Sequence, residues 1–163
     1  MTETADILTL HRPPLVTIRT AKLRDLTELT AMIGELAAHH GDIAATSVVE
    51  LERDLFSAVP WIAALVAEAE GRLIGYAILT PLYRPSESAR GMEINHLYVR
   101  QAHRGTGIGR HLIDSSRDHA RKAGCSYLSV SAATGNVQAH RFYEELSFKP
   151  RPVTGMRYLQ AIA

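Results

Sequence analysis

Hydrophobic residues recur along the chain with two periods, and these periods predict its strands and helices. Residues 15–21 alternate between apolar and polar positions and are rich in β-branched side chains, as is typical of a strand. Over residues 23–41 the apolar positions recur at helical spacing until a glycine ends the pattern, so we predict a first helix. Ser47 and Glu50 have the spacing of a capping box, which predicts a second helix that Pro60 closes.

The middle of the chain is typical of β-strands. Residues 61–83 contain two β-type runs separated by a Glu70-Gly71 turn, and this arrangement predicts an antiparallel hairpin. The polar residues 84–91 predict a loop, long enough to border a substrate pocket, although a plain exposed connection is the simpler interpretation. Residues 92–99 then predict a further strand.

The last third of the chain predicts two more helices and further strands. Residues 108–124 form an amphipathic pattern that a glycine ends, and residues 126–132 are typical of a strand. Asn136 stands where an N-cap belongs, ahead of a helix over residues 137–146. Residues 148–159 predict short terminal strands with a proline-rich connection. The apolar face of the helix at 108–124 consists of Ile108, Leu112, Ile113, Ser116 and Ala120.

Composition and charge exclude several classes of protein. Eighteen basic and seventeen acidic residues nearly cancel, so no overall field indicates a nucleic-acid or membrane partner. The first dozen residues lack the pattern of a secretory signal, and the single cysteine, Cys125, fits a reducing compartment, so we expect a cytoplasmic location. The adjacent His39 and His40 would point in different directions on a helix, and no cysteine or HExxH motif accompanies them. We therefore expect no metal site.

Three alternating glycines, Gly105, Gly107 and Gly109, lie between a predicted strand and a predicted helix. Glycine has no Cβ, so such a backbone can turn its N–H groups toward one anion, and the positive end of the helix adds to the attraction. No lysine follows the glycines as in a P-loop, and Arg110 stands where a dinucleotide-binding fingerprint needs a glycine. The remaining interpretation is a turn that holds a pyrophosphate without a metal, with Arg104 and Arg110 beside it.

Two motifs in this order resemble the GNAT family of N-acetyltransferases. Residues 104–109, RGTGIG, match the family's R/Q-x-x-G-x-G/A element, and Asn136, Ala139, Phe142 and Tyr143 match its downstream N-x-x-A-x-x-F-Y pattern. The order of elements from residue 16 to about 160 is similar as well. The N-terminal half resembles the diamine and spermidine/spermine acetyltransferase-like branch, mainly in its apolar spacing, which does not name a polyamine substrate.

The resemblance implies a fold, a domain organisation and an assembly. We expect an α/β (α+β) acyl-CoA N-acyltransferase fold, in which about four helices flank a mixed, mostly antiparallel central sheet. The fourth and fifth strands of that sheet would splay apart. We expect an N-terminal extension at residues 1–14, a single N-acetyltransferase domain at residues 15–163, and a homodimer.

The resemblance also implies a binding site for acetyl-CoA (coenzyme A). The strand before the glycine turn would contact the pantetheine arm through its backbone, and an N–H of Tyr98 or Val99 would stabilise the thioester oxygen. Asn136 would hold the coenzyme arm or cap its helix. The expected coenzyme contacts are Leu97, Tyr98, Val99, Arg104, Gly105, Thr106, Gly107, Ile108, Gly109, Arg110, Asn136, Ala139 and Tyr143.

Three side chains are candidates for proton transfer. Tyr143 occupies the position of the family's tyrosine, whose hydroxyl approaches the coenzyme sulfur, and a phenol with a pKa of about 10 can protonate a thiolate. Glu93 stands where the histone-acetylating branch carries its catalytic glutamate. The polyamine-like branch instead has an acidic pair, which falls here on Asn95 and His96, and this departure argues against a polyamine substrate. His96 has a suitable pKa for a base, but strand alternation places it opposite Glu93 before any bulge resets the pattern. We favour Glu93, acting through water.

These residues favour an acetyl-CoA-dependent N-acetyltransferase, an acyltransferase of the EC 2.3.1 class. A primary amine of a small molecule would attack the thioester directly in a ternary complex, because no cysteine nucleophile indicates a covalent intermediate. Two alternatives stay open. The acceptor could be a lysine or the N-terminus of a protein or peptide, or the chain could be a non-catalytic acyl-CoA-binding module.

Overall fold

A computed structural model of the chain describes residues 15–153 and 155–162. The chain divides into two compact units, Met1–Ser131 and Ala132–Ala163, and each is described by itself. The expected N-terminal extension lies outside the described residues, and the single domain over residues 15–163 stays a prediction.

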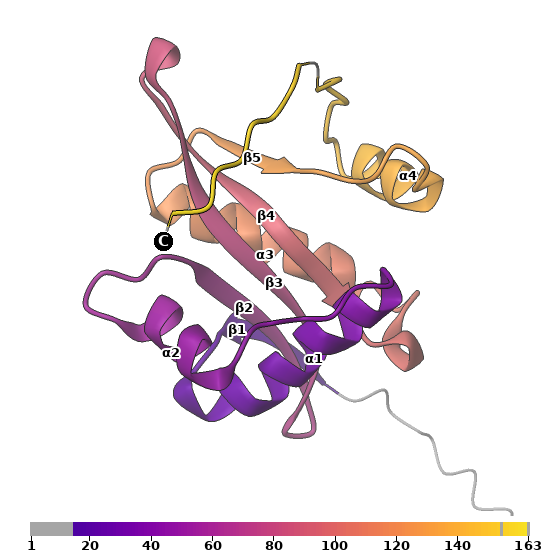
Figure 1. Ribbon diagram of the computed structural model, residues 1–163. Helices are drawn as coiled ribbons and strands as arrows, with labels where there is room; N and C mark the ends of the chain where they lie inside the picture. The colour runs from indigo at the N-terminus through magenta and orange to yellow at the C-terminus, as the bar shows by residue number, and fades with distance from the viewer. Residues whose placement is uncertain (1–14, 154, 163) are drawn as a thin grey trace, which may run out of the picture. The chain divides into compact units, whose positions relative to one another are not determined.

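A five-stranded sheet forms the first unit, with its strands in sequence order (Figure 1). β1 (Val16–Thr20), β2 (Ala63–Ala69), β3 (Arg72–Arg84) and β4 (Ala89–Val99) are antiparallel neighbours. β5 (Tyr127–Val130) pairs with β4 in parallel. The sheet is therefore mixed and mostly antiparallel, as predicted.

The sheet is covered on both faces (Figure 1). α1 (Leu26–His39) and α2 (Val48–Phe56) pack their apolar side chains against one face, and α3 (Ile108–Lys122) packs against the other. α3 buries all five side chains that the sequence predicts for its apolar face. None of the helices within the described residues has the length and apolar character needed to cross a bilayer. The main apolar cluster includes Leu26, Leu29, Met32, Ile33, Leu36, Leu51, Leu55, Ala64, Val66, Tyr76, Ile78 and Tyr98.

The cap and the hairpin turn that short-range sequence signals predict are both present in the structure. Ser47 caps α2 by accepting a hydrogen bond from the Glu50 N–H at 3.3 Å, and the Glu50 carboxylate accepts from the Ser47 N–H at 3.0 Å. Glu70 and Gly71 both adopt positive φ angles, of 50° and 76°, which is the geometry of a two-residue hairpin turn between β2 and β3. These local choices fix where α2 begins and where the hairpin reverses.

The predicted loop at residues 84–91 is wrong at both ends. β3 continues to Arg84 and β4 begins at Ala89, so that only a short 3-10 helix, η2 (Pro85–Glu87), and Ser88 connect them. Ser88 adopts a left-handed φ of 48°, which permits the tight reversal. Two further 3-10 helices, η1 (Leu23–Asp25) and η3 (Gln101–His103), precede α1 and the glycine turn.

The second unit contains α4 (Val137–Glu145), which Asn136 caps. The Asn136 Oδ1 accepts a hydrogen bond from the Ala139 N–H at 3.0 Å, as the sequence predicts. The predicted terminal strands are absent from the described part of residues 148–159. Pro150 and Pro152 have no backbone N–H to donate to a neighbouring strand, which explains why the first of these does not form there.

Candidate functional site

A β-bulge interrupts the pairing of β3 with β4 shortly before the glycine turn. Leu79 of β3 pairs with Ile94, whereas the residue before it, Ile78, pairs with His96. Asn95 is therefore an extra residue on β4 that has no partner position on β3. The sequence contains no glycine or proline at this point, so only the register of the two strands reveals the bulge.

The bulge brings three polar side chains to one face of the sheet. Thr80 pairs with Glu93, and Ile78 pairs with His96. Because Thr80 and Ile78 are two residues apart on β3, Glu93 and His96 face the same side. The Asn95 Nδ2 donates a hydrogen bond to the Thr80 Oγ1 at 2.6 Å, on that side as well. Our expectation that strand alternation separates His96 from Glu93 is therefore wrong.

The two candidate bases differ in their surroundings. His96 Nδ1 lies 3.2 Å from the hydroxyl of the fully buried Tyr76. Burial, together with the nearby His40, lowers the pKa of His96, which favours the neutral ring at pH 7. The Glu93 Oε1 instead accepts a hydrogen bond from the Ser131 hydroxyl at 3.1 Å. Among the hydrogen bonds of the described residues, none engages the other carboxylate oxygen of Glu93, which leaves it for a water or a substrate.

β4 and β5 separate beyond the bulge. Their pairing joins Gly91–Ile94 to Tyr127–Val130 and does not extend further, whereas β4 itself continues to Val99. The predicted splay between the fourth and fifth strands is therefore confirmed. The last part of β4 has a sheet partner on the β3 side, and its other edge has no strand beside it among the described residues.

Along the last part of β4, the backbone groups of alternate residues point away from β3, toward the open edge that has no neighbouring strand. The Arg100 N–H donates to a carbonyl of β3 at 2.9 Å. In an antiparallel pair, the backbone N–H and C=O groups of successive residues point alternately toward and away from the neighbouring strand. Those of Leu97 and Val99 therefore point to the open side. In agreement, the Val99 carbonyl accepts a hydrogen bond from the Arg104 Nε at 2.9 Å. Of the two predicted donors, Tyr98 and Val99, the register therefore favours Val99, whose backbone N–H points to the open side as that of Leu97 does.

The glycine turn that follows leaves a run of backbone donors without acceptors. Gly105 and Gly107 adopt φ angles of 76° and 87°, which favour glycine. α3 begins at Ile108 and has no side-chain cap, because Gly107 is its N-cap residue. Among the hydrogen bonds of the described residues, no acceptor faces the backbone N–H groups of residues 105–110. This arrangement at the positive end of a helix fits an anionic group such as a diphosphate.

An ion-pair network holds the end of β4 against α1. The Arg100 guanidinium bridges the Glu28 and Glu35 carboxylates, at 3.0 Å and 3.1 Å. The Tyr98 hydroxyl donates to Glu35 at 3.0 Å, and the Arg104 guanidinium lies 5.7 Å from the centre of the Tyr98 ring. Tyr98 thus uses its side chain in packing and hydrogen bonding. No motif in the sequence points to Glu35 or Arg100, because their contacts are long-range.

The second unit holds the candidate tyrosine. The ring of Tyr143 packs edge-on against Phe142 and Phe148, at centroid distances of 5.3 Å and 5.7 Å. Burial raises the pKa of Tyr143, so the phenol keeps its proton at neutral pH. Asn136 uses its Oδ1 to cap α4, which is one of its two predicted roles.

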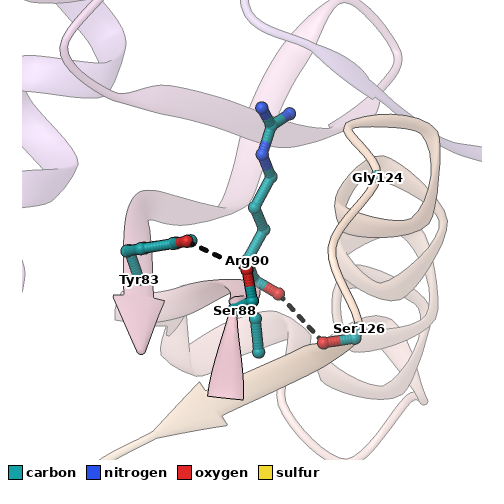
Figure 2. A pocket seen from close by; sticks show the side chains of 6 residues that line it. Tyr83, Ser88, Arg90, Gly124 and Ser126 are labelled. Carbon is teal, nitrogen blue, oxygen red and sulfur yellow. Dashed lines mark hydrogen bonds between the residues drawn. The ribbon is translucent and has the colours of Figure 1, made fainter. Parts of the chain in front are cut away.

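A cavity of about 650 Å³ lies at the other end of α3 (Figure 2). It is bordered by the β3–β4 hairpin and by the segment that follows the C-terminal end of α3. The Arg90 carbonyl accepts hydrogen bonds there from the Ser126 N–H and hydroxyl. A helix of this length spans about 22 Å, so the cavity is remote from the glycine turn. It is lined by Tyr83, Ser88, Ala89, Arg90, Gly124 and Ser126.

Comparison with known proteins agrees with this geometry. Residues 29–148 match the model of the acetyltransferase (GNAT) family. The chain is 30% identical over 141 residues to the thialysine N-epsilon-acetyltransferase of Sus scrofa, covering 80% of this chain and 82% of that protein.

A bacterial relative and a solved structure extend the comparison. The chain is 27% identical over 143 residues to an L-methionine sulfoximine/L-methionine sulfone acetyltransferase of Pseudomonas paraeruginosa, covering 81% of this chain and 79% of that protein. The crystal structure of a ribosomal-protein-alanine N-acetyltransferase from Brucella melitensis biovar Abortus 2308 superimposes with a TM-score of 0.69 and 26% identity. That match covers 89% of this chain and all of the other.

Proposed function

The chain belongs to the acetyltransferase (GNAT) family and is an acetyl-CoA-dependent N-acetyltransferase, and on this premise we propose that its acceptor is a primary amine of a small molecule. Two relatives that the chain matches over about four-fifths of its length act, by their names, on thialysine and on methionine sulfoximine or methionine sulfone. Both names denote small amino acids, which favours an acceptor of that size. The replacement of an acidic pair by Asn95 and His96 argues against a polyamine.

The run of unpaired backbone N–H groups at residues 105–110 supports the binding of acetyl-CoA, on which the proposal depends. Acetyl-CoA supplies an acetyl group activated as a thioester and carries a diphosphate between its pantetheine arm and its adenosine. In our proposal the amides of the glycine turn bind the diphosphate, and Arg104 and Arg110 add positive charge beside it. The free N–H of Val99 on the open edge of β4 donates to the thioester oxygen, where negative charge develops.

Proton transfer requires two further groups in this proposal. An alkylammonium has a pKa near 10.4, so a base must take a proton before the amine can attack, and Glu93 does so through a water molecule. Tyr143 returns a proton to the sulfur that leaves. Burial raises the pKa of Tyr143, so the phenol carries the proton that this step needs at neutral pH. Asn136 and Ala139 belong to the expected coenzyme contacts through the family motif.

We expect Tyr143→Phe to lower kcat by about 100-fold, the usual scale for loss of a general acid. The affinity for acetyl-CoA should change little, because the backbone amides of the turn are intact. Thiol release from acetyl-CoA against a panel of thialysine, methionine sulfoximine, spermidine and a lysine-containing peptide measures both turnover and acceptor class. Tyr158→Phe is the matched control, because Tyr158 lies in the same unit and is 89% exposed.

The panel also separates the alternatives. Turnover of the peptide alone would identify a protein acetyltransferase, the class named for one structural neighbour. Tight binding of acetyl-CoA without turnover of any amine would contradict enzymatic transfer to these acceptors. An unchanged kcat in Tyr143→Phe would remove Tyr143 from the reaction and leave the acceptor class standing.

We further propose that the chain forms a homodimer, that residues 15–163 act as one domain, and that the protein is cytoplasmic. The homodimer follows from the likeness to the diamine acetyltransferase branch, and light scattering of the purified chain tests it. The single cysteine, Cys125, supports a reducing compartment.

A further inference from the structure

The hydroxyl of Tyr76 has one hydrogen-bond partner among the described residues, and that partner is His96. Tyr76 is fully buried, and burial raises the pKa of its phenol, so the group carries its proton at all working pH values. The hydroxyl oxygen lies 3.2 Å from the His96 Nδ1. The two side chains come from neighbouring strands, since Tyr76 lies on β3 and His96 on β4.

The direction of this hydrogen bond follows from the cost of burying an unused donor. A buried O–H group that donates to nothing loses the hydration that it has in the unfolded chain and gains no replacement. Within the described residues, every buried side-chain nitrogen or oxygen has a partner. The phenol therefore donates to Nδ1, which must then carry a lone pair. A neutral imidazole has one N–H, so the proton sits on Nε2.

The Nε2 atom of His96 is accessible from outside. Within the described residues, every buried side-chain nitrogen or oxygen has a hydrogen-bond partner. The Nε2 atom has no partner there, so it is not fully buried and reaches solvent. His96 is half-buried and faces the same side of the sheet as Glu93. An N–H group thus lies on the same face of the sheet as the carboxylate that we assign to proton transfer.

We propose that Tyr76 is a positioning residue that fixes His96 as its Nε2–H form, so that His96 donates a hydrogen bond to the acceptor substrate and takes no proton from it. The first half of this statement concerns the protein alone, and the second half rests on the proposed function. With Nδ1 engaged by Tyr76 and Nε2 already protonated, His96 has no free lone pair for an ammonium proton. Glu93 is then the base of the pair.

Nitrogen NMR of histidine tests the first half without any substrate. In protein labelled with ¹⁵N-histidine at pH 7, we expect His96 to show a protonated Nε2 and an unprotonated Nδ1. His96→Gln identifies the signals by their loss. Tyr76→Phe should shift both signals toward the averaged values of a ring whose proton exchanges between Nδ1 and Nε2. Tyr83 is an exposed tyrosine of the same strand, and Tyr83→Phe should leave both signals unchanged. A proton on Nδ1 in the wild-type protein would overturn the proposal.

Steady-state kinetics with thialysine as the probe acceptor tests the second half. Loss of one substrate hydrogen bond in His96→Ala should raise KM about tenfold and change kcat much less. His96→Gln should recover part of this loss, because its amide N–H takes roughly the place of Nε2–H. A fall in kcat of about 100-fold in both variants would show that His96 takes the proton, and would overturn the proposal. If the wild-type protein turns over no amine, the proposed function fails while the NMR result still decides the form of His96.

Discussion

Replacement of Gly107 by aspartate should weaken acetyl-CoA binding by about 100-fold or more. Gly107 lies in the middle of the turn, directly before α3, and no atom lies within 4 Å of a Cβ placed on it. A carboxylate there would lie beside the unpaired amides of residues 105–110 and repel the diphosphate. Two like charges about 4 Å apart near a protein surface interact by roughly 4 kcal/mol, which is more than enough for this loss. Titration calorimetry with acetyl-CoA at low salt measures it.

Gly107→Asn is the matched control for this variant. Asparagine has nearly the same shape as aspartate and tolerates the left-handed φ of 87° about equally well, but it carries no charge. We expect it to weaken binding several-fold, from the strain at that φ alone. The difference between the two variants should shrink as salt is added. Equal affinities of the two variants would show that no diphosphate sits at the turn.

Replacement of Asp25 by alanine should lower the free energy of unfolding by about 3 kcal/mol. Asp25 is only 5% exposed, and its carboxylate accepts hydrogen bonds from Arg19 at 2.6 Å and 2.9 Å. It also accepts a hydrogen bond from the Lys22 N–H at 2.7 Å, which fixes the start of η1, directly before α1. Arg19 itself is 17% exposed and would keep only Glu68 as an acidic partner. Urea denaturation followed by circular dichroism measures the change.

The pH dependence of this loss has a definite sign. The hydrogen bonds from Arg19 lower the pKa of Asp25 in the folded protein below its usual value near 3.8. The stabilising effect is therefore fully present above the pKa of the unfolded chain and disappears as the pH falls through the folded pKa. The difference between wild type and Asp25→Ala should be constant from pH 7 to about pH 5 and shrink below about pH 4.

An exposed ion pair provides the comparison for Asp25. Asp118 is paired with Arg121 on the surface of α3, where the two side chains are 64% and 73% exposed. Asp118→Ala should change the free energy of unfolding by less than about 1 kcal/mol. If Asp25→Ala costs no more than Asp118→Ala, the ion pair between Arg19 of β1 and Asp25 of η1 does not stabilise the fold.

Local signals in the sequence predict most of the fold. The face of α3 follows from the spacing of Ile108, Leu112 and Ile113, because a helix repeats every 3.6 residues whatever lies around it. The capping box at Ser47 and the hairpin turn at Glu70 also need only near neighbours. The predicted terminal strands do not form because a strand needs a hydrogen-bonded neighbour. A proline-rich segment has few backbone N–H donors with which to pair.

Only part of the candidate site can be predicted from the sequence. The glycine turn is visible in the sequence, since Gly105 and Gly107 adopt φ angles that favour glycine. The bulge at Asn95 is not, because it depends on how β3 and β4 align across the whole hairpin. The contact of Tyr76 with His96 has the same origin, as the two residues are 20 positions apart and meet only through that register. Alternation along β4 therefore assigns His96 to the wrong face.

In our proposal, acetyl-CoA binding depends most on the backbone amides of residues 105–110, which hold the diphosphate of the coenzyme. A ¹H–¹⁵N amide spectrum recorded during addition of coenzyme A tests this claim directly. We predict that the largest shifts fall on the amides of residues 105–110, and that the Val99 amide on the open edge of β4 also moves. Shifts confined to residues around the cavity at Arg90, with the turn unchanged at saturation, would contradict it.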